Sequence, residues 1–407
     1  MAALKYWVWL TTLPNLTEGS KALLMAHFSS PEDIYYADET ALRQVEGLQE
    51  EQIALLRNRS LDGAERVLAE CARKDIFLVT MADALYPDRL RNIHQPPLLL
   101  YGKGAMPLFD EEAAVAVVGT RGCTPYGIRC AEKLGYELTQ QGGMVVSGLA
   151  KGADAAAMRG ALRFGGFTCA VLGGGVDVVY PAENRRLYED VAATGVLLSE
   201  YPPRTEPAAW HFPVRNRIIS GLSVATVVVE APVRSGALIT AADALEQGRE
   251  VFAVPGPIDA PNSAGCHQLI REGAGLVTCG WDVLEEYAGR YPHKLRRAAP
   301  PMPPLPKGAG EPKTEERETK RPQEPEETAE TLPCLTVEQA AGLPEEQLAV
   351  LRALRTDTPR LSDELAEETG LPIQRVLPAL TLLEISGWVV SGGGRSFTRC
   401  VALPEQE

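Results

Sequence analysis

Between residues 110 and 290 the sequence alternates short apolar runs with longer amphipathic segments, and this pattern most restricts the possible folds. The apolar runs are not interrupted by a polar residue at every second position. Such strands are buried on both faces, as in a parallel sheet covered by helices. The expected strands are 115–118, 144–146, 168–172, 196–198, 225–229 and 251–254, and the expected helices between them are 126–141, 154–164, 183–193 and 240–247.

Residues 1–70 read as short helices, and Leu-rich turns at 13–16 and 45–48 precede two of them. These turns resemble those of helix-hairpin-helix and SAM-like modules, whose backbone amides can hold a DNA phosphate. A small helical packing module is the favoured alternative, because Glu50 and Glu51 would repel phosphate.

Residues 335–407 predict three helices and a two-stranded wing around 392–394, which is a winged helix. The third helix of such domains enters the major groove when they read duplex DNA. Here that helix carries Arg375, and four acids lie in 361–368 before it. A protein contact is therefore favoured over duplex reading.

Composition places the domain boundaries. We predict a helical module over 1–70, a Rossmann-like α/β core with a parallel sheet over 71–290, and a winged-helix domain over 335–407. Residues 291–334 are rich in Pro and Glu and poor in large apolar residues, so they are expected to form an extended tether.

The net charge limits the possible partners. The 407 residues contain 40 Lys and Arg against 54 Asp and Glu, a formal net charge of −14. This argues against coating nucleic acid by bulk charge, although it leaves room for a local basic cleft. No apolar run is long enough for a membrane span, and the eight cysteines form no Cys-x-x-Cys pair, so a reducing cytoplasm without a metal site is expected.

Small residues and arginines follow three of the predicted strands. The first strand ends in Gly119, Thr120 and Arg121; glycine lets a ligand approach the backbone, and the guanidinium matches phosphate. Free amides at the start of the next helix also suit an anion. The neighbouring strand ends supply Ser147, Gly148, Gly173 and Gly174, followed by Arg185 and Arg186. Close strand-to-helix packing alone is the structural alternative.

The segment 212–221 adds Arg215, Asn216 and Arg217, with Glu200 and Glu230 at other strand ends. Two interpretations are equally open. The arginines contact phosphate, or they neutralise carboxylates that would be costly to bury alone.

Several enzyme templates fail. There is no Gly-x-x-x-x-Gly-Lys-Ser/Thr loop and no Gly-x-Ser-x-Gly elbow, and the Gly-rich segment 173–178 lacks the third glycine of the dinucleotide fingerprint. The five histidines are dispersed. We therefore expect an anion-binding site without a cofactor and without catalysis.

At these residues the chain resembles the DNA-processing protein A family (DprA, also called Smf). About half of the chain carries the resemblance, in family order. Its motifs are Tyr86-Pro87, 96–102, Val118-Gly119-Thr120-Arg121, 147–152, Tyr180-Pro181, 212–217, 235–240, 248–256 and 265–270.

The resemblance implies a protein that binds single-stranded DNA, protects it during natural transformation and loads the RecA recombinase, and that is not an enzyme. It implies a phosphate pocket at Gly119, Thr120 and Arg121, with Ser147, Gly148, Gly173 and Gly174 alongside. It also implies a homodimer through the late part of the core, with Leu245, His267, Ile270 and Leu276 at the interface.

The chain departs from the family pattern at two positions. Met158 stands where the family usually has His, and Ala182 stands where a basic residue often follows Tyr-Pro. Arg185 or Arg186 could replace that basic residue. The alternative function is that of a nucleotide-processing phosphoribohydrolase on a related fold, but segment 235–242 lacks its catalytic Glu.

Overall fold

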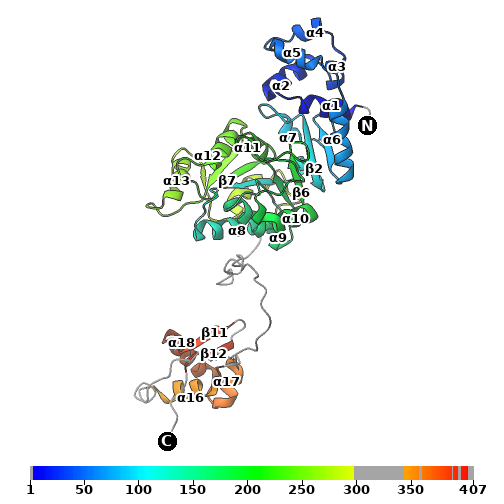
Figure 1. Ribbon diagram of the computed structural model, residues 1–407. Helices are drawn as coiled ribbons and strands as arrows, with labels where there is room; N and C mark the ends of the chain where they lie inside the picture. The colour runs from blue at the N-terminus through cyan, green and yellow to red at the C-terminus, as the bar shows by residue number, and fades with distance from the viewer. Residues whose placement is uncertain (1–2, 298–342, 357–359, 387, 393–395, 402–407) are drawn as a thin grey trace, which may run out of the picture. The chain divides into compact units, whose positions relative to one another are not determined.

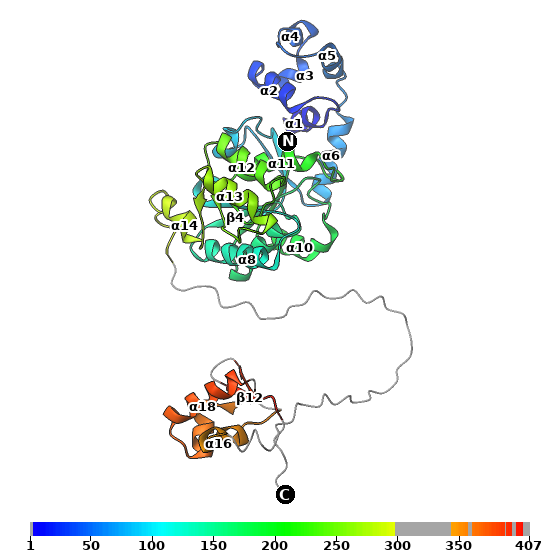
Figure 2. The ribbon, with the colours of Figure 1, turned by 90° about the vertical axis from the view of Figure 1, so that its left-hand side faces the viewer.

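The computed structural model describes residues 3–297, 343–356, 360–386, 388–392 and 396–401. The chain divides into two compact units, Met1–Ala309 and Gly310–Glu407, which are described separately (Figures 1 and 2). The predicted tether lies outside the described residues from position 298 onward, and the predicted domain boundaries remain a proposal. Helix α6 (Asp62–Arg73) continues across the boundary predicted at residue 70.

A nine-stranded sheet forms the centre of the first unit, in the order β1-β2-β6-β5-β4-β3-β7-β8-β9. The strands from β6 to β9 in this order are parallel, which confirms the predicted α/β core, and β1 and β2 extend the sheet through antiparallel pairing. The strands are β1 Phe77–Thr80, β2 Leu99–Gly104, β3 Ala114–Val118, β4 Met144–Ser147, β5 Thr168–Val171, β6 Val196–Ser199, β7 Ala225–Val228, β8 Glu250–Ala253 and β9 Gly275–Leu276.

Helices cover both faces of this sheet, which explains why its strands are apolar throughout. Val115 and Val117 of β3 face a core formed with α8 (Pro125–Gln140), α9 (Ala153–Phe164) and α10 (Arg185–Thr194). Ala114, Ala116 and Val118 face the opposite core, formed with α11 (His211–Gly221), α12 (Gly236–Glu246) and α13 (Ala264–Arg271). Figure 1 shows the two helical layers on either side of the strands.

The N-terminal helices have a third apolar core of their own. It contains Trp7, Leu24 and Ile53, and it includes Leu99 and Tyr101 of β2. The helices of this region are therefore joined to the sheet through its antiparallel edge. They are α1 Leu4–Thr12, α2 Glu18–His27, α3 Pro31–Tyr36, α4 Glu39–Arg43, α5 Glu50–Leu56 and α6.

The second unit contains three helices, α16 (Glu345–Ala353), α17 (Ser362–Thr369) and α18 (Ile373–Ile385). A small sheet accompanies them, in the order β10-β12-β11, with bounds Arg360–Leu361, Ser396–Arg399 and Val389–Gly392. The predicted helices and wing are present, and β10 is an additional strand. Arg375 of α18 lies with Nη1 2.5 Å from Oε1 of Glu346, so this arginine is paired within the unit.

The order of strands places a ligand site. β3 lies between β4, the next strand in the chain, and β7, from which the sheet grows in the other direction. Ligands of such sheets bind at this switch point, beyond the carboxyl ends of the strands. Within the described part of the chain, no helix is both long and apolar enough for a membrane span, and no cluster of three or more His, Cys, Asp or Glu could hold a metal ion.

Candidate nucleic-acid interface

A cleft of about 540 Å³ opens at the switch point, and an adjoining cavity of about 80 Å³ lies beside it. The turn after β3 and the first turns of α11 and α12 line the cleft. The turns after β4 and β5 line the cavity. Five residues line both spaces: Arg121, Ala150, Tyr180, Pro207 and Phe212.

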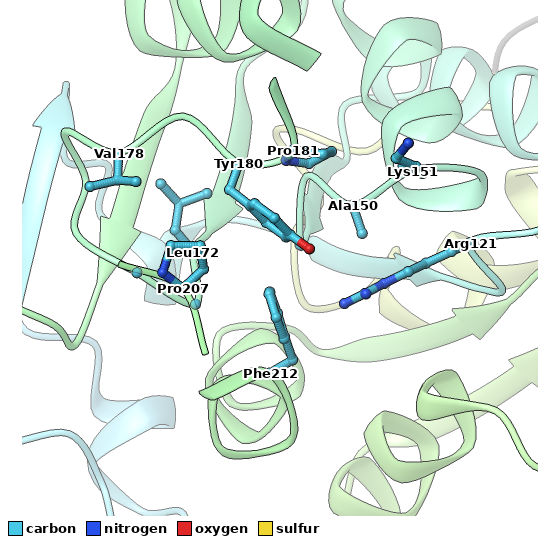
Figure 3. A pocket seen from close by; sticks show the side chains of 12 residues that line it. Arg121, Ala150, Lys151, Leu172, Val178, Tyr180, Pro181, Pro207 and Phe212 are labelled. Carbon is cyan, nitrogen blue, oxygen red and sulfur yellow. The ribbon is translucent and has the colours of Figure 1, made fainter. Parts of the chain in front are cut away.

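Arg121 is exposed, and its guanidinium carbon lies 4.7 Å from the centre of the Phe212 ring. The Tyr180 ring lies 5.6 Å from the same ring, centre to centre. Figure 3 shows the three side chains pointing into one space. No carboxylate of the described residues lies within ion-pair distance of Arg121, so its donors are free for an anion.

All four predicted glycines lie in close contact with other groups, and a Cβ at Gly174 would lie 2.9 Å from the carbonyl oxygen of Thr205. A Cβ at Gly119 would lie 2.6 Å from Cβ of Ala153, and one at Gly173 would lie 3.0 Å from the Phe212 ring. A Cβ at Gly148 would lie 2.4 Å from Nη2 of Arg215. These glycines therefore allow α9, Phe212 and Arg215 to approach the strand ends.

Arg215 is buried at the inner wall of the cleft, and its guanidinium donates to backbone carbonyl groups. Nη1 donates to the carbonyl oxygen of Gly148 at 2.9 Å and to that of Val171. Burial, with a smaller contribution from the charge of Arg121, lowers the pKa of Arg215 to about 10, so it stays charged at neutral pH. It supplies a positive field from behind the cleft.

Arg217 lines neither the cleft nor the cavity. Its Nη2 lies 2.8 Å and 3.0 Å from the two carboxylate oxygens of Glu200, and both side chains are largely buried. Burial raises the pKa of Glu200, and Arg217 opposes this shift. Of the two interpretations open from the sequence, neutralisation of a buried carboxylate therefore accounts for Arg217.

Four other predicted residues have different positions. Asn216 lines the cleft, and its side-chain amide donates to the carbonyl oxygen of Gly236 at 3.2 Å. Ser147 is buried and donates to the carbonyl oxygen of Val117 at 2.6 Å, so it joins two strands. Arg185 and Arg186 are exposed in the first turn of α10, and neither lines the cleft or the cavity.

The structure brings four further residues to the site. Lys151, Tyr180 and Phe212 line the cavity, and Arg234 lines the cleft. Lys151 forms an ion pair with Glu183. The spacing of Phe212, Arg215 and Ile219 along α11 is a helical face, and this signal in the sequence would have indicated which side of the helix meets the cleft.

The loop that carries Pro207 is held by helix α6. The guanidinium of Arg204 lies 3.0 Å from each carboxylate oxygen of Glu70, and the Arg204 backbone amide donates to Asp177 at 2.8 Å. Lys74 pairs with Glu70 at 2.7 Å and also with Asp177. The N-terminal helices therefore position one wall of the cleft.

Two carboxylates lie at the same strand ends. Asp154 lines the cleft from the first turn of α9, and its Oδ2 accepts from the Gly148 amide at 3.1 Å. Burial raises its pKa, with Arg215 acting in the opposite direction. Glu230 accepts from the amide and the hydroxyl of Thr124 at 2.8 Å and 2.6 Å, so it fixes the turn after β3.

A family model described as DNA recombination-mediator protein A matches residues 77–288, more than half of the chain. The chain belongs to this family. A second model, described as DprA winged helix domain, matches residues 336–395. The predicted family and the predicted winged helix are both confirmed.

Family members from several bacteria are similar to the chain. Protein Smf of Escherichia coli is 32% identical over 395 residues, which are 97% of this chain and 95% of that protein. DNA processing protein DprA of Bacillus subtilis is 43% identical over 225 residues, 55% of this chain and 76% of that protein. The X-ray structure of DNA processing protein A from Streptococcus pneumoniae has a TM-score of 0.56 and 38% identity, covering 69% of this chain and 97% of that one.

The structure describes the two positions at which the sequence is expected to depart from the family pattern. Met158 of α9 is fully buried in the core, where a titratable side chain would need a partner. Ala182 is exposed in the 3₁₀ turn before α10 and presents no polar side-chain group.

The residues predicted for dimerisation lie at the β8–β9 end of the sheet in this family member. Leu245 and Leu276 are 58% and 52% exposed. Ile270 is half-buried against the core, and Nε2 of His267 lies 3.0 Å from the carbonyl oxygen of Gly256. The two leucines are therefore the accessible members of this set.

Proposed function

We propose that the cleft binds the sugar–phosphate backbone of single-stranded DNA without sequence preference. The observation that carries this proposal is Arg121, an exposed arginine without a carboxylate partner in the described chain, beside two aromatic rings at the switch point. Charged side chains that follow a backbone, combined with aromatic surfaces for bases, are the usual elements of single-strand binding.

The charge of the rest of the cleft favours single-stranded DNA over duplex DNA as the ligand. Arg121 and Arg215 supply positive charge at one set of strand ends, whereas the chain as a whole carries a net charge of −14. Sequence-independent duplex binding depends on many neutralised phosphates and therefore on an extended basic surface. A few arginines inside a cleft can instead hold one or two phosphates of a flexible strand.

Arg121→Ala tests this proposal. The variant should bind fluorescent oligo-dT about tenfold or more weakly, because a charge-assisted hydrogen bond is lost. The slope of log affinity against log salt should become shallower by about 0.7, the value for one phosphate of a single strand. Arg163→Ala is the matched control, since Arg163 is an exposed arginine near the end of α9, the helix whose first turn reaches the cleft.

The outcome against the proposal is equally specific. If Arg121→Ala and Arg163→Ala both keep the affinity and the salt slope of the wild type, the cleft does not hold the strand.

We propose further that the protein binds DNA without catalysing a reaction. The carboxylates at the site hold structural hydrogen bonds: Asp154 accepts from Gly148 and Glu230 accepts from Thr124. Incubation of nucleoside monophosphates and of labelled single strands with the protein, followed by chromatography, should return both unchanged.

The finer biological role extends this proposal. We propose that the protein works in the cytoplasm as a homodimer, protects single strands in transformation or another recombination process, and promotes RecA loading. The names of the relatives, DNA processing protein and recombination-mediator protein, support the process. Strand exchange by RecA in the presence of a single-strand binding protein, with wild type and Arg121→Ala compared, tests the loading step.

A further inference from the structure

Trp210 is an exposed aromatic side chain next to the cleft. Its side chain is 65% exposed, although tryptophan usually buries most of its ring. It precedes α11 directly, and no hydrophobic cluster of the first unit includes it. A large ring left open to solvent is available to pack against a bound ligand.

The Trp210 ring is held in place from one side. It makes an edge contact with the His211 ring, with centres 4.0 Å apart and an interplanar angle of 79°. The Tyr201 ring stacks on His211 at 4.0 Å and meets Trp210 at 6.4 Å. This arrangement orders the indole and leaves much of it accessible, which lowers the entropy that a ligand must remove.

The residues before and after Trp210 in the sequence contact the site. Ala209 and Phe212 line the cleft. Nδ1 of His211 lies 2.8 Å from the carbonyl oxygen of Gly173, a residue of the cavity that Figure 3 displays. Trp210 itself lines neither space, but in the chain it stands between Ala209, which lines the cleft, and His211, which contacts the cavity.

We propose that Trp210 is a stacking platform for a nucleobase of the strand whose phosphate lies at Arg121. The inference rests on the proposed function and adds a base-binding subsite to it. Every base has a π-face, so stacking gives affinity without sequence reading. The indole face holds no hydrogen-bond donor for a base edge, and the overlap should favour purines over pyrimidines only by area.

The test compares a strand with bases to one without them. Fluorescent oligo-dT and an abasic oligomer with the same number of phosphates are titrated against wild type, Trp210→Ala and Trp210→Phe. Trp210→Ala should bind oligo-dT about tenfold more weakly and the abasic oligomer as well as the wild type does. Trp210→Phe should retain most of the oligo-dT affinity, because it keeps an aromatic face.

Two controls separate this inference from the proposed function. Phe164→Ala removes an exposed aromatic ring at the last residue of α9 and should change neither affinity. Arg121→Ala should weaken binding of both oligomers, and a wild type that binds neither would overturn the proposed function itself. If Arg121→Ala weakens both oligomers but Trp210→Ala leaves their affinity ratio unchanged, the stacking platform is overturned.

Salt provides an independent readout. Stacking releases no counterions, so the loss caused by Trp210→Ala should be the same at low and high salt, whereas the loss caused by Arg121→Ala should shrink as salt rises. A Trp210→Ala effect that disappears at high salt would contradict stacking.

Discussion

The guanidinium of Arg215 donates to the carbonyl oxygen of Gly148 at 2.9 Å from a buried position on α11. The contact is possible because Gly148 has no side chain: a Cβ there would lie 2.4 Å from Nη2 of Arg215. The arginine thus fixes the turn after β4 while its charge lies behind the cleft. One side chain therefore contributes both to the shape of the site and to its electrostatic potential.

Gly148→Ala and Arg215→Ala should each lower stability and DNA binding together. The alanine methyl group would displace the guanidinium, and loss of the guanidinium removes its hydrogen bonds to two carbonyl oxygens, at about 1–3 kcal/mol each. Urea unfolding and oligo-dT titration measure the two effects, with Arg163→Ala as the exposed control. Unchanged stability in both variants would show that the Arg215 contacts are unimportant.

Arg217→Ala should destabilise the fold and leave the DNA affinity of the folded protein unchanged. Removing one partner of a buried ion pair costs about 3–5 kcal/mol, because Glu200 would stay buried without its counter-charge. The double variant Arg217→Leu/Glu200→Leu should recover much of this loss, since apolar replacements need no counter-charge. Weaker oligo-dT binding by the folded double variant would indicate that Arg217 contributes to DNA binding.

DNA affinity should rise as the pH falls, in part through Asp154. Burial raises the pKa of this carboxyl, so its charged form is unfavourable for folding. The negative charge also repels a phosphate bound nearby. Both free-energy costs disappear as the pH falls through the folded-state pKa. Asp154→Asn keeps an oxygen that can accept from Gly148 and should bind more tightly at about pH 8.

The affinity of Asp154→Asn should also change less than that of the wild type as the pH is lowered from about pH 8. Every other titratable group is common to both proteins, so the difference between the two curves isolates Asp154. Parallel curves over this range would exclude Asp154 as the source of the dependence.

Leu245→Arg combined with Leu276→Arg should give a monomer. Both side chains are more than half exposed at the same end of the sheet, and two buried charges would oppose a symmetric apolar contact. Light scattering after size-exclusion chromatography measures the mass, with Leu23→Arg on α2 as the exposed control. A dimer that survives the double variant would place the interface elsewhere.

The predicted strands were recognisable because each is a short run of apolar residues, which are buried in the sheet. The strand predicted at 144–146 appears as Met144–Ser147, and the one predicted at 251–254 appears as Glu250–Ala253. Strands β1 and β2 were not predicted, since their pairing depends on distant partners: Tyr101 of β2 pairs with Ser199 of β6. Local sequence contains little information about such contacts.

The sequence by itself determined the parallel core, the glycines at the strand ends and the family. Tertiary structure decided which arginine is available. Arg121, Arg215 and Arg217 have the same chemistry in the sequence, but Arg121 is exposed, Arg215 holds the backbone and Arg217 pairs with Glu200. Residues two positions apart on a helix point in nearly opposite directions, so the packing of α11 separates Arg215 from Arg217. The function of each charge depends on the surroundings that the fold gives it.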